Sequence, residues 1–268
     1  MKLQLKAPAY QPSINYLKQY DYTDFIRSHC ARLRLYQVPH IFEMECHVAR
    51  KKELTHSEFL YHLLETEVWS RYEKGLAKRH RAANLPSLHN LSDFDFTFSQ
   101  SISESRLREL VWIQQAFNVI LIGPSGTGKT FIATGLIHNA VQSGFRANIL
   151  TMKDLISTIR LKNLTPTYLA AYQRLLRLHL LAIDDIMHFP LKKKEAIAFF
   201  NLINTLHEKT SIIVTTNKTP TEWAQTLDDP VLAAAILDRL MFKCEIIKLA
   251  GNSYRMKNRQ TIFKNYPS

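Results

Sequence analysis

A glycine-rich octapeptide, GPSGTGKT, has residue types and spacing that suit the binding of a nucleoside triphosphate. It fits the pattern G-x-x-x-x-G-K-[ST], with the apolar stretch NVILI before it and the amphipathic stretch TFIATGLIHNAVQ after it. Backbone N–H groups in such a turn point at phosphate oxygens, and the helix that follows adds the positive end of its dipole. The sequence therefore predicts an ATP-binding loop made of Gly123, Pro124, Ser125, Gly126, Thr127, Gly128, Lys129 and Thr130. In this loop Lys129 is expected to reach the β- and γ-phosphates, and the Thr130 hydroxyl to ligate Mg²⁺.

Two adjacent carboxylates follow the apolar stretch LLAI, about 50 residues after the glycine-rich loop. Asp184 ends this stretch and is expected to hold Mg²⁺ through its water shell, because a hard cation prefers oxygen ligands. Asp185 is the candidate that polarises the attacking water. A loop or helix cap would also explain two such acids, but the preceding phosphate loop favours the magnesium role.

Three more polar residues are candidates for the same site. Asn217 follows the apolar stretch IIVTT and can reach the γ-phosphate or the water, although a turn before Pro220 explains it nearly as well. Arg239 lies near the end of the helical stretch VLAAAILDRLM and suits charge that builds up on a transferring phosphoryl group, also from a neighbouring subunit. A salt bridge to Asp238 or to a partner helix is the competing interpretation. Arg255 can approach the phosphates or lie on the surface, and spacing alone selects neither arginine.

The elements that must position these residues follow from hydrophobic patterning after residue 105. Short apolar runs alternate there with stretches long enough for crossover helices, which predicts an α/β domain with a five-stranded, mainly parallel sheet buried on both faces. The expected strands are residues 119–122, 147–150, 180–183, 212–214 and 246–249.

The N-terminal third has a helical pattern instead. Thr55 and Glu58 form a capping-box start for a long helix. That helix carries apolar residues four apart, which we expect to face a core; they are Leu60, Leu64, Val68, Tyr72 and Leu76, with Leu63 beside them.

The predicted organisation is a small all-α domain at residues 1–84, a linker at 85–104 and the α/β domain at 105–268. The linker assignment depends on an aperiodic stretch rich in Pro, Ser and Asn. The alternating Phe94, Phe96 and Phe98 within it are typical of an extended segment that packs on the next domain.

Basic residues concentrate at both ends of the chain. The net charge is +12, with 14 Lys/Arg against 9 Asp/Glu in residues 1–81 and 17 against 10 in residues 151–268. Arg71, Lys74, Lys78 and Arg81 are three and four apart, so they share one helix face, and we expect them to contact the backbone of double-stranded DNA. A solvated helix face is the ordinary alternative for such a row.

The sequence does not support a membrane protein, a secreted protein or a zinc site made of cysteines and histidines. No apolar run approaches the roughly 20 residues needed to cross a bilayer, and the N-terminus lacks the apolar core of a signal peptide, so we expect a cytoplasmic protein with no membrane role. The three cysteines are far apart without a CxxC pair, and the histidine spacings match no zinc pattern.

Taken together, DFDF at residues 93–96, GPSGTGKT, LLAIDD, TTN, DPVLAAAILDRL at 229–240 and SYR at 253–255 resemble the IstB family. These are AAA+ ATPases that assist the transposase of an insertion sequence, and they are related to the helicase loader DnaC. The resemblance implies an ATP-dependent homo-oligomer, with ATP at subunit interfaces, that binds and deforms DNA and directs the transposase to a target. It also implies Walker B roles for Asp184 and Asp185, sensor 1 for Asn217, a trans-acting arginine finger for Arg239 and sensor 2 for Arg255.

Two alternatives to the transposition helper stay open at this point. A replicative helicase loader would have the same ATPase with a helicase ring as partner. A DNA-organising scaffold would use ATP as an assembly ligand with little turnover. The chain also departs from most AAA+ proteins in having Asp185 where they have Glu, and it lacks the usual glycine after the two acids.

Overall fold

The structure, a computed structural model, describes residues 22–85, 91, 104–186, 190–219, 222–223, 227 and 229–250. It divides into two compact units, Met1–Lys74 and Gly75–Ser268. Arg255 and the three phenylalanines of the predicted linker lie outside the described residues. Within the described ranges, no helix is both long and apolar enough to cross a membrane.

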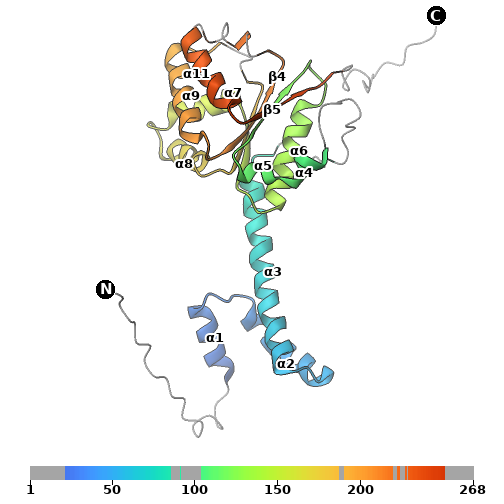
Figure 1. Cartoon of the computed structure of the whole chain (residues 1–268). Helices are drawn as coiled ribbons and strands as arrows, with labels where there is room; N and C mark the ends of the chain where they lie inside the picture. The colour runs from blue at the N-terminus through green and yellow to red at the C-terminus, as the bar shows by residue number, and fades with distance from the viewer. Residues whose placement is uncertain are drawn as a thin grey trace, which may run out of the picture. The chain divides into compact units, whose positions relative to one another are not determined.

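The N-terminal unit is all-α, as the sequence predicts. It contains α1 (Tyr22–Arg32), α2 (Val38–Lys52) and the first part of α3 (His56–Ala82), which are labelled in Figure 1. The predicted capping box is confirmed, since the Thr55 N–H donates to Glu58 Oε2 at 2.8 Å and the Glu58 N–H donates to Thr55 Oγ1 at 3.3 Å. A small core forms around Cys30, Val38 and Leu63.

The apolar row of α3 does not face a core as expected. Leu63 is buried, but Leu60, Leu64, Val68 and Tyr72 are 55%, 44%, 65% and 43% exposed. The core of this unit instead takes the α3 face that carries Leu63, with Phe59 beside it. Only Leu76, at the end of the row, packs against a core, and that core belongs to the second unit. Helical spacing identifies an apolar face correctly but does not say what covers it.

A buried carboxylate holds the N-terminal unit together on the side of α3 that faces its core. Glu67 is 3% exposed and accepts hydrogen bonds from the Gln37 N–H at 2.6 Å and from Arg71 Nε at 2.9 Å. Burial alone would raise the pKa of Glu67, yet these donors hold it below its ordinary value. Arg71 also donates to the Arg34 carbonyl, so this arginine has a structural part that its spacing did not reveal.

The second unit confirms the predicted sheet. Five parallel strands lie in the order β2-β3-β4-β1-β5. The strands are β1 (Asn118–Ile122), β2 (Ala147–Thr151), β3 (Leu180–Asp184), β4 (Ser211–Thr216) and β5 (Cys244–Lys248). The helices in the described part of this unit, besides the end of α3, include α4 (Glu104–Glu109), α5 (Val111–Gln114), α6 (Lys129–Gln142), α7 (Met152–Leu161), α8 (Pro166–Leu175), α9 (Lys193–Leu206) and α11 (Pro230–Met241).

Helices cover the sheet on both faces, which is why the central strands β1, β3 and β4 are buried almost along their whole length. Figure 1 shows α7, α9 and α11 on one side of the sheet and α6 with α4 and α5 on the other. Alternate strand residues enter the two cores: Ile120 belongs to the core that contains Phe199 of α9, whereas Leu121 belongs to the core that contains Leu136 of α6. The carboxyl ends of all five strands therefore meet at one edge between two helical layers, and that edge is where the predicted site residues follow.

Candidate nucleotide-binding site

The strand order brings the predicted phosphate loop and the predicted acids to one edge of the sheet. The loop follows β1, the acids end β3, and Asn217 follows β4, which lies between these two strands. Three segments far apart in the sequence thus converge, because parallel strands end together. The backbone of the loop is tied to this edge, since the Gly123 N–H donates to the Thr216 carbonyl at 3.2 Å.

Glycine is required at three positions of the loop for two different reasons. Gly126 and Gly128 have φ angles of 85° and 90°, a region that residues with a Cβ atom rarely adopt. At Gly123 the constraint is space, because a Cβ atom there would lie 2.4 Å from the Leu249 carbonyl oxygen. The backbone of the loop, free of side chains at these positions, can therefore approach phosphate oxygens closely.

The ammonium group of Lys129 is fixed inside this loop. Lys129 is 7% exposed, and its Nζ donates to the carbonyls of Gly123 at 2.7 Å and Pro124 at 2.8 Å. A buried positive charge at the start of α6 adds to the positive end of that helix's dipole. Both charges favour the same class of ligand, a polyanion such as a triphosphate.

Thr130 and Asp184 meet across the site, as a magnesium-binding pair should. The Thr130 hydroxyl donates to Asp184 Oδ1 at 3.0 Å and lies 3.2 Å from Oδ2. Hydroxyl and carboxylate oxygens are ligands that Mg²⁺ accepts, usually with waters and phosphate oxygens in the remaining positions. The two residues therefore fit the cation that the sequence predicts, with the phosphate loop on the adjoining side.

Thr215 positions both acids, and the sequence reasoning missed it. Thr215 is fully buried, and its hydroxyl donates to Asp184 Oδ1. The Thr215 Oγ1 atom also accepts a hydrogen bond from the Asp185 N–H at 2.9 Å. Asp185 is exposed and has a φ of 54°, a left-handed conformation that aspartate tolerates better than most residues. One hydroxyl thus orients both the Asp184 carboxylate and the turn that presents Asp185. The signal was a pair of threonines, Thr215 and Thr216, in place of aliphatic residues at the end of the apolar stretch IIVTT.

We expect Thr215→Val to slow ATP hydrolysis by about 10- to 100-fold while nucleotide binding changes little, as for residues that orient metal-binding groups. Valine keeps the shape and burial of threonine but cannot donate to Asp184 or accept from Asp185. Steady-state phosphate release together with binding of an ATP analogue would measure both effects. Thr205→Val is the matched control, because its hydroxyl bonds only the Asn201 carbonyl on α9 among the contacts described. Hydrolysis at the parent rate in Thr215→Val would remove this residue from the site.

Asn217 is placed where its predicted role requires, at the carboxyl end of β4. It is exposed and directly follows Thr216, whose carbonyl binds the phosphate loop. β4 pairs with β1 on one side and β3 on the other, so Asn217 emerges between the loop and the two acids. Its part in catalysis remains a prediction.

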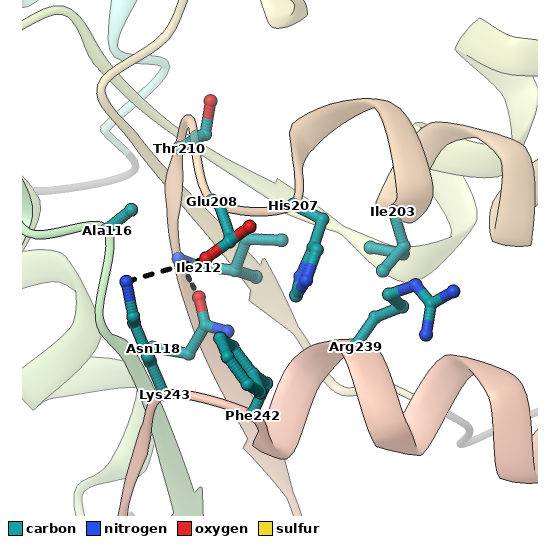
Figure 2. A pocket seen from close by; sticks show the side chains of 10 residues that line it. All are labelled: Ala116, Asn118, Ile203, His207, Glu208, Thr210, Ile212, Arg239, Phe242 and Lys243. Carbon is teal, nitrogen blue, oxygen red and sulfur yellow. Dashed lines mark hydrogen bonds and ion pairs between the residues drawn. The ribbon is translucent and has the colours of Figure 1, made fainter.

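Arg239 lies at the other edge of the sheet from the phosphate loop. α11 ends at Met241 and β5 starts at Cys244, so Arg239 is near the level at which the strands begin. Figure 2 shows it on α11 beside a small cavity lined by Asn118 and Ile212, at the starts of β1 and β4, and by Lys243. The guanidinium donates to Asp238 and, through Nε at 3.2 Å, to Asn204 Oδ1 of α9. The salt bridge weighed as an alternative therefore exists, and it leaves the side chain 33% exposed.

The cavity in Figure 2 is a structural feature at the amino ends of the strands and not the nucleotide site. Asn118 closes it with two buried hydrogen bonds, accepting from the Ile212 N–H at 2.9 Å and donating to the Leu240 carbonyl at 2.9 Å. Lys243 pairs with Glu208 across its mouth at 3.6 Å. The features that suit a phosphate ligand, which are the glycine-rich loop, the start of α6 and the Lys129 ammonium, lie at the opposite edge.

The residues predicted to contact DNA are all exposed on α3. These exposed residues are Arg71, Lys74, Lys78 and Arg81. Arg71 also forms an ion pair with Glu67. Their contact with DNA remains a prediction.

Relatives of this chain are ATP-binding proteins of insertion sequences. It is 45% identical over 222 residues to one from an IS21-like insertion sequence of Bacteroides fragilis, covering 82% of this chain and 84% of the relative. It is 36% identical over 233 residues to one from IS21 of Pseudomonas aeruginosa, covering 86% and 88%.

Solved structures show a similar fold at low sequence identity. DnaI matches with a TM-score of 0.52 and 18% identity, over 62% of this chain and 90% of DnaI. AMPPCP-bound DnaA from Aquifex aeolicus matches with a TM-score of 0.51 and 17% identity, over 68% and 58%. These similarities support the AAA+ P-loop fold. The profile of the family described as "IstB-like ATP binding protein" matches residues 28–262, and the chain, with its phosphate loop and acid pair, belongs to that family.

Proposed function

We propose that this protein is an ATP-hydrolysing, DNA-binding helper of an insertion-sequence transposase, which oligomerises on DNA and takes part in choosing the target site. The observation that carries the ATPase part is the contact between Thr130 and Asp184 beside the buried Lys129. The transposase as partner is supported by the insertion-sequence names of the relatives. DNA and ATP are both cytoplasmic, and we place the protein there.

The residues at the carboxyl edge of the sheet can divide hydrolysis among them. Lys129 and the loop N–H groups would bind the β- and γ-phosphates, and Thr130 with Asp184 would hold Mg²⁺, which neutralises charge on the phosphate oxygens. Asp185 would accept a proton from the water that attacks the γ-phosphorus, while the bond to the β–γ bridging oxygen breaks. Asn217 would orient that water by a hydrogen bond.

A neighbouring subunit would complete the site with Arg239. In a single chain this arginine lies at the far edge of the sheet from Lys129, about 15 Å of strand away at the usual rise per residue. Its guanidinium is held by Asn204 and Asp238, so it is presented from a rigid helix and not from a loop. A catalytic arginine in this place would serve the next subunit's ATP, which would link nucleotide state to assembly.

DNA binding would depend on cations of α3. Lys74, Lys78 and Arg81 are exposed, whereas Arg71 already has a buried carboxylate as partner. Lysine and arginine contacts to phosphates carry no base information, so binding should tolerate sequence changes and weaken with salt.

The salt dependence of binding tests this assignment. We expect a Lys74→Ala, Lys78→Ala, Arg81→Ala protein to bind duplex DNA more weakly, with a log–log salt slope smaller by about three, because each phosphate contact contributes about 0.9. Fluorescence anisotropy across a salt series measures the slope. Lys193→Ala, Lys194→Ala, Lys209→Ala removes as much charge from exposed sites of the second unit. An equal loss in that control, or an affinity that barely moves with salt, would contradict the assignment.

Two measurements separate the transposition helper from its alternatives. Phosphate release with and without duplex DNA distinguishes an ATPase from a scaffold, which should stay near background in both. Pull-down of the full-length protein against the transposase and against a replicative helicase distinguishes helper from loader. Capture of the helicase alone would overturn the transposition assignment while leaving the ATPase in place.

A further inference from the structure

The last residue of β4, Thr216, forms hydrogen bonds across its neighbour Asn217. Thr216 is 1% exposed, and its Oγ1 atom accepts a hydrogen bond from the Lys218 N–H at 3.0 Å. The same hydroxyl donates to the Lys218 carbonyl at 3.3 Å. A threonine hydroxyl that bonds the backbone two residues ahead fixes the turn between them. One buried side chain therefore holds the backbone on both sides of Asn217.

Thr216 is also tied to the phosphate loop through its backbone. Its carbonyl accepts the Gly123 N–H at 3.2 Å, and in the sheet it pairs with Ile122, the last residue of β1. Leu249 holds the same point from the other neighbouring strand, since its N–H donates to the Ile122 carbonyl at 2.7 Å. The residue that fixes Asn217 is thus itself fixed against the first residue of the phosphate loop.

The segment after Asn217 is held as well. Glu222 Oε2 accepts hydrogen bonds from the Thr219 N–H at 2.6 Å and from the Thr219 hydroxyl at 2.7 Å. These bonds and, to a smaller extent, the charge of Lys218 hold the pKa of Glu222 below its ordinary value. Trp223 is fully buried, and its N–H donates to the Thr219 carbonyl at 3.3 Å. Asn217 is therefore an exposed residue in a turn that is anchored at both ends.

The two neighbouring threonines of β4 have different partners, because successive strand residues point to opposite faces of a sheet. Thr215 bonds the acids at the end of β3, whereas Thr216 bonds the turn that carries Asn217. A group that orients an attacking water must be held accurately, since a displacement of about 1 Å can cost about 100-fold in rate. The exposed Asn217 amide relies on a fixed backbone for such accuracy.

We propose that Thr216 is a positioning residue for ATP hydrolysis, whose hydroxyl holds Asn217 in place beside the phosphate loop. The proposal rests on the proposed function, in which Asn217 orients the attacking water, and it names what sets the position of that asparagine. Thr216 serves the chemical step and not nucleotide affinity, because its bond to Gly123 comes from the backbone and does not depend on the side chain.

Replacing the hydroxyl tests the proposal in the full-length protein. We expect Thr216→Val to lower kcat for phosphate release by about 10- to 100-fold, while KM and the affinity for an ATP analogue stay within about twofold of the parent values. Valine keeps the shape of threonine but loses both bonds to Lys218. Thr216→Ser keeps the hydroxyl and should restore hydrolysis to near the parent rate. Thr158→Val is the matched control, because Thr158 is a buried threonine of α7 whose hydroxyl donates to the Asp154 carbonyl at 2.9 Å.

Three results of this experiment would overturn the proposal. The first is hydrolysis at the parent rate by Thr216→Val, and the second is an equal loss in Thr216→Ser, since either means that the hydroxyl is not needed. The third is a loss of analogue affinity as large as the loss of kcat, which would assign Thr216 to support of the phosphate loop. Thermal melting checks that each variant folds, and Thr216→Ala is a second variant without the hydroxyl should the valine protein not fold.

A double-mutant cycle with Asn217→Ala shows whether Thr216 acts through that residue. If it does, Thr216→Val adds less than about twofold to the loss in Asn217→Ala, because residues that act as a unit have non-additive effects. Full additivity would give Thr216 a role apart from Asn217 and overturn the proposal while leaving the ATPase in place. A parent protein that binds ATP but releases no phosphate above background, with or without duplex DNA, would instead contradict the proposed function, and Thr216 would then have no reaction to serve.

Discussion

The Lys129→Ala protein is expected to lose nucleotide binding, with an affinity for a non-hydrolysable ATP analogue lowered by about 100-fold or more. The ammonium is buried in the phosphate loop and held by the Gly123 and Pro124 carbonyls, so it is already placed when a phosphate arrives. Calorimetric titration with the analogue and Mg²⁺ measures the loss.

A matched lysine distinguishes a local effect from a general loss of positive charge. Lys209→Ala removes an exposed lysine just before β4, at the opposite edge of the same sheet, and should bind the analogue as the parent does. Thermal melting of both variants without nucleotide checks that the fold survives, since Lys129→Ala also removes a donor from the Gly123 and Pro124 carbonyls. Unchanged affinity in a folded Lys129→Ala protein would remove the phosphate loop from the function.

Arg239→Ala should show the opposite pattern, with nucleotide binding spared and hydrolysis by the assembled protein reduced by about 1,000-fold. The reason is geometric, because α11 carries Arg239 to the sheet edge remote from the chain's own Lys129 and Thr130. If the site is shared between subunits, Arg239→Ala removes the positive charge that would stabilise the transition state in the neighbouring subunit's site. Phosphate release is measured in the oligomer, and Arg174→Ala, which removes an exposed arginine of α8, serves as control.

Mixing two inactive proteins tests whether Arg239 acts between subunits. An Arg239→Ala subunit has an intact phosphate loop, and a Lys129→Ala subunit has an intact Arg239. Their mixture can form a complete interface, so hydrolysis should recover above that of either protein alone. No recovery in mixed oligomers, or parental hydrolysis by Arg239→Ala, would assign this arginine to its salt bridge with Asp238.

The sequence predicted the sheet and most of the site because their signals are local. A buried parallel strand must be apolar along its length, so all five strands could be found from runs such as LLAI. The glycines of the phosphate loop are required by φ angles and by the approach of Leu249, which depend on few neighbours. The pairing of Thr130 with Asp184 then follows from the parallel order of β1, β4 and β3.

What the sequence could not predict depends on contacts between distant segments. Thr215 is one threonine in a strand, and its role appears only when β4 lies beside β3. Arg71 shares its spacing with Lys74, yet a carboxylate on the same helix and the Arg34 carbonyl in the turn after α1 hold it. On α3, the residues Leu60, Leu64, Val68 and Tyr72 have the periodicity of a core face although they are exposed, because periodicity identifies an apolar face without saying what covers it.

Asn118 connects the two ends of this arrangement through one buried amide. It starts β1, the strand that leads to the phosphate loop. Its side chain accepts a hydrogen bond at the start of β4, the strand that leads to Asn217, and donates one to the Leu240 carbonyl beside Arg239. In the proposed oligomer, a shift of β4 on hydrolysis in one pocket would therefore pull on the arginine inserted into the next. Hydrolysis in successive pockets would then be cooperative, and Asn118 would be the side chain that couples one pocket to the next.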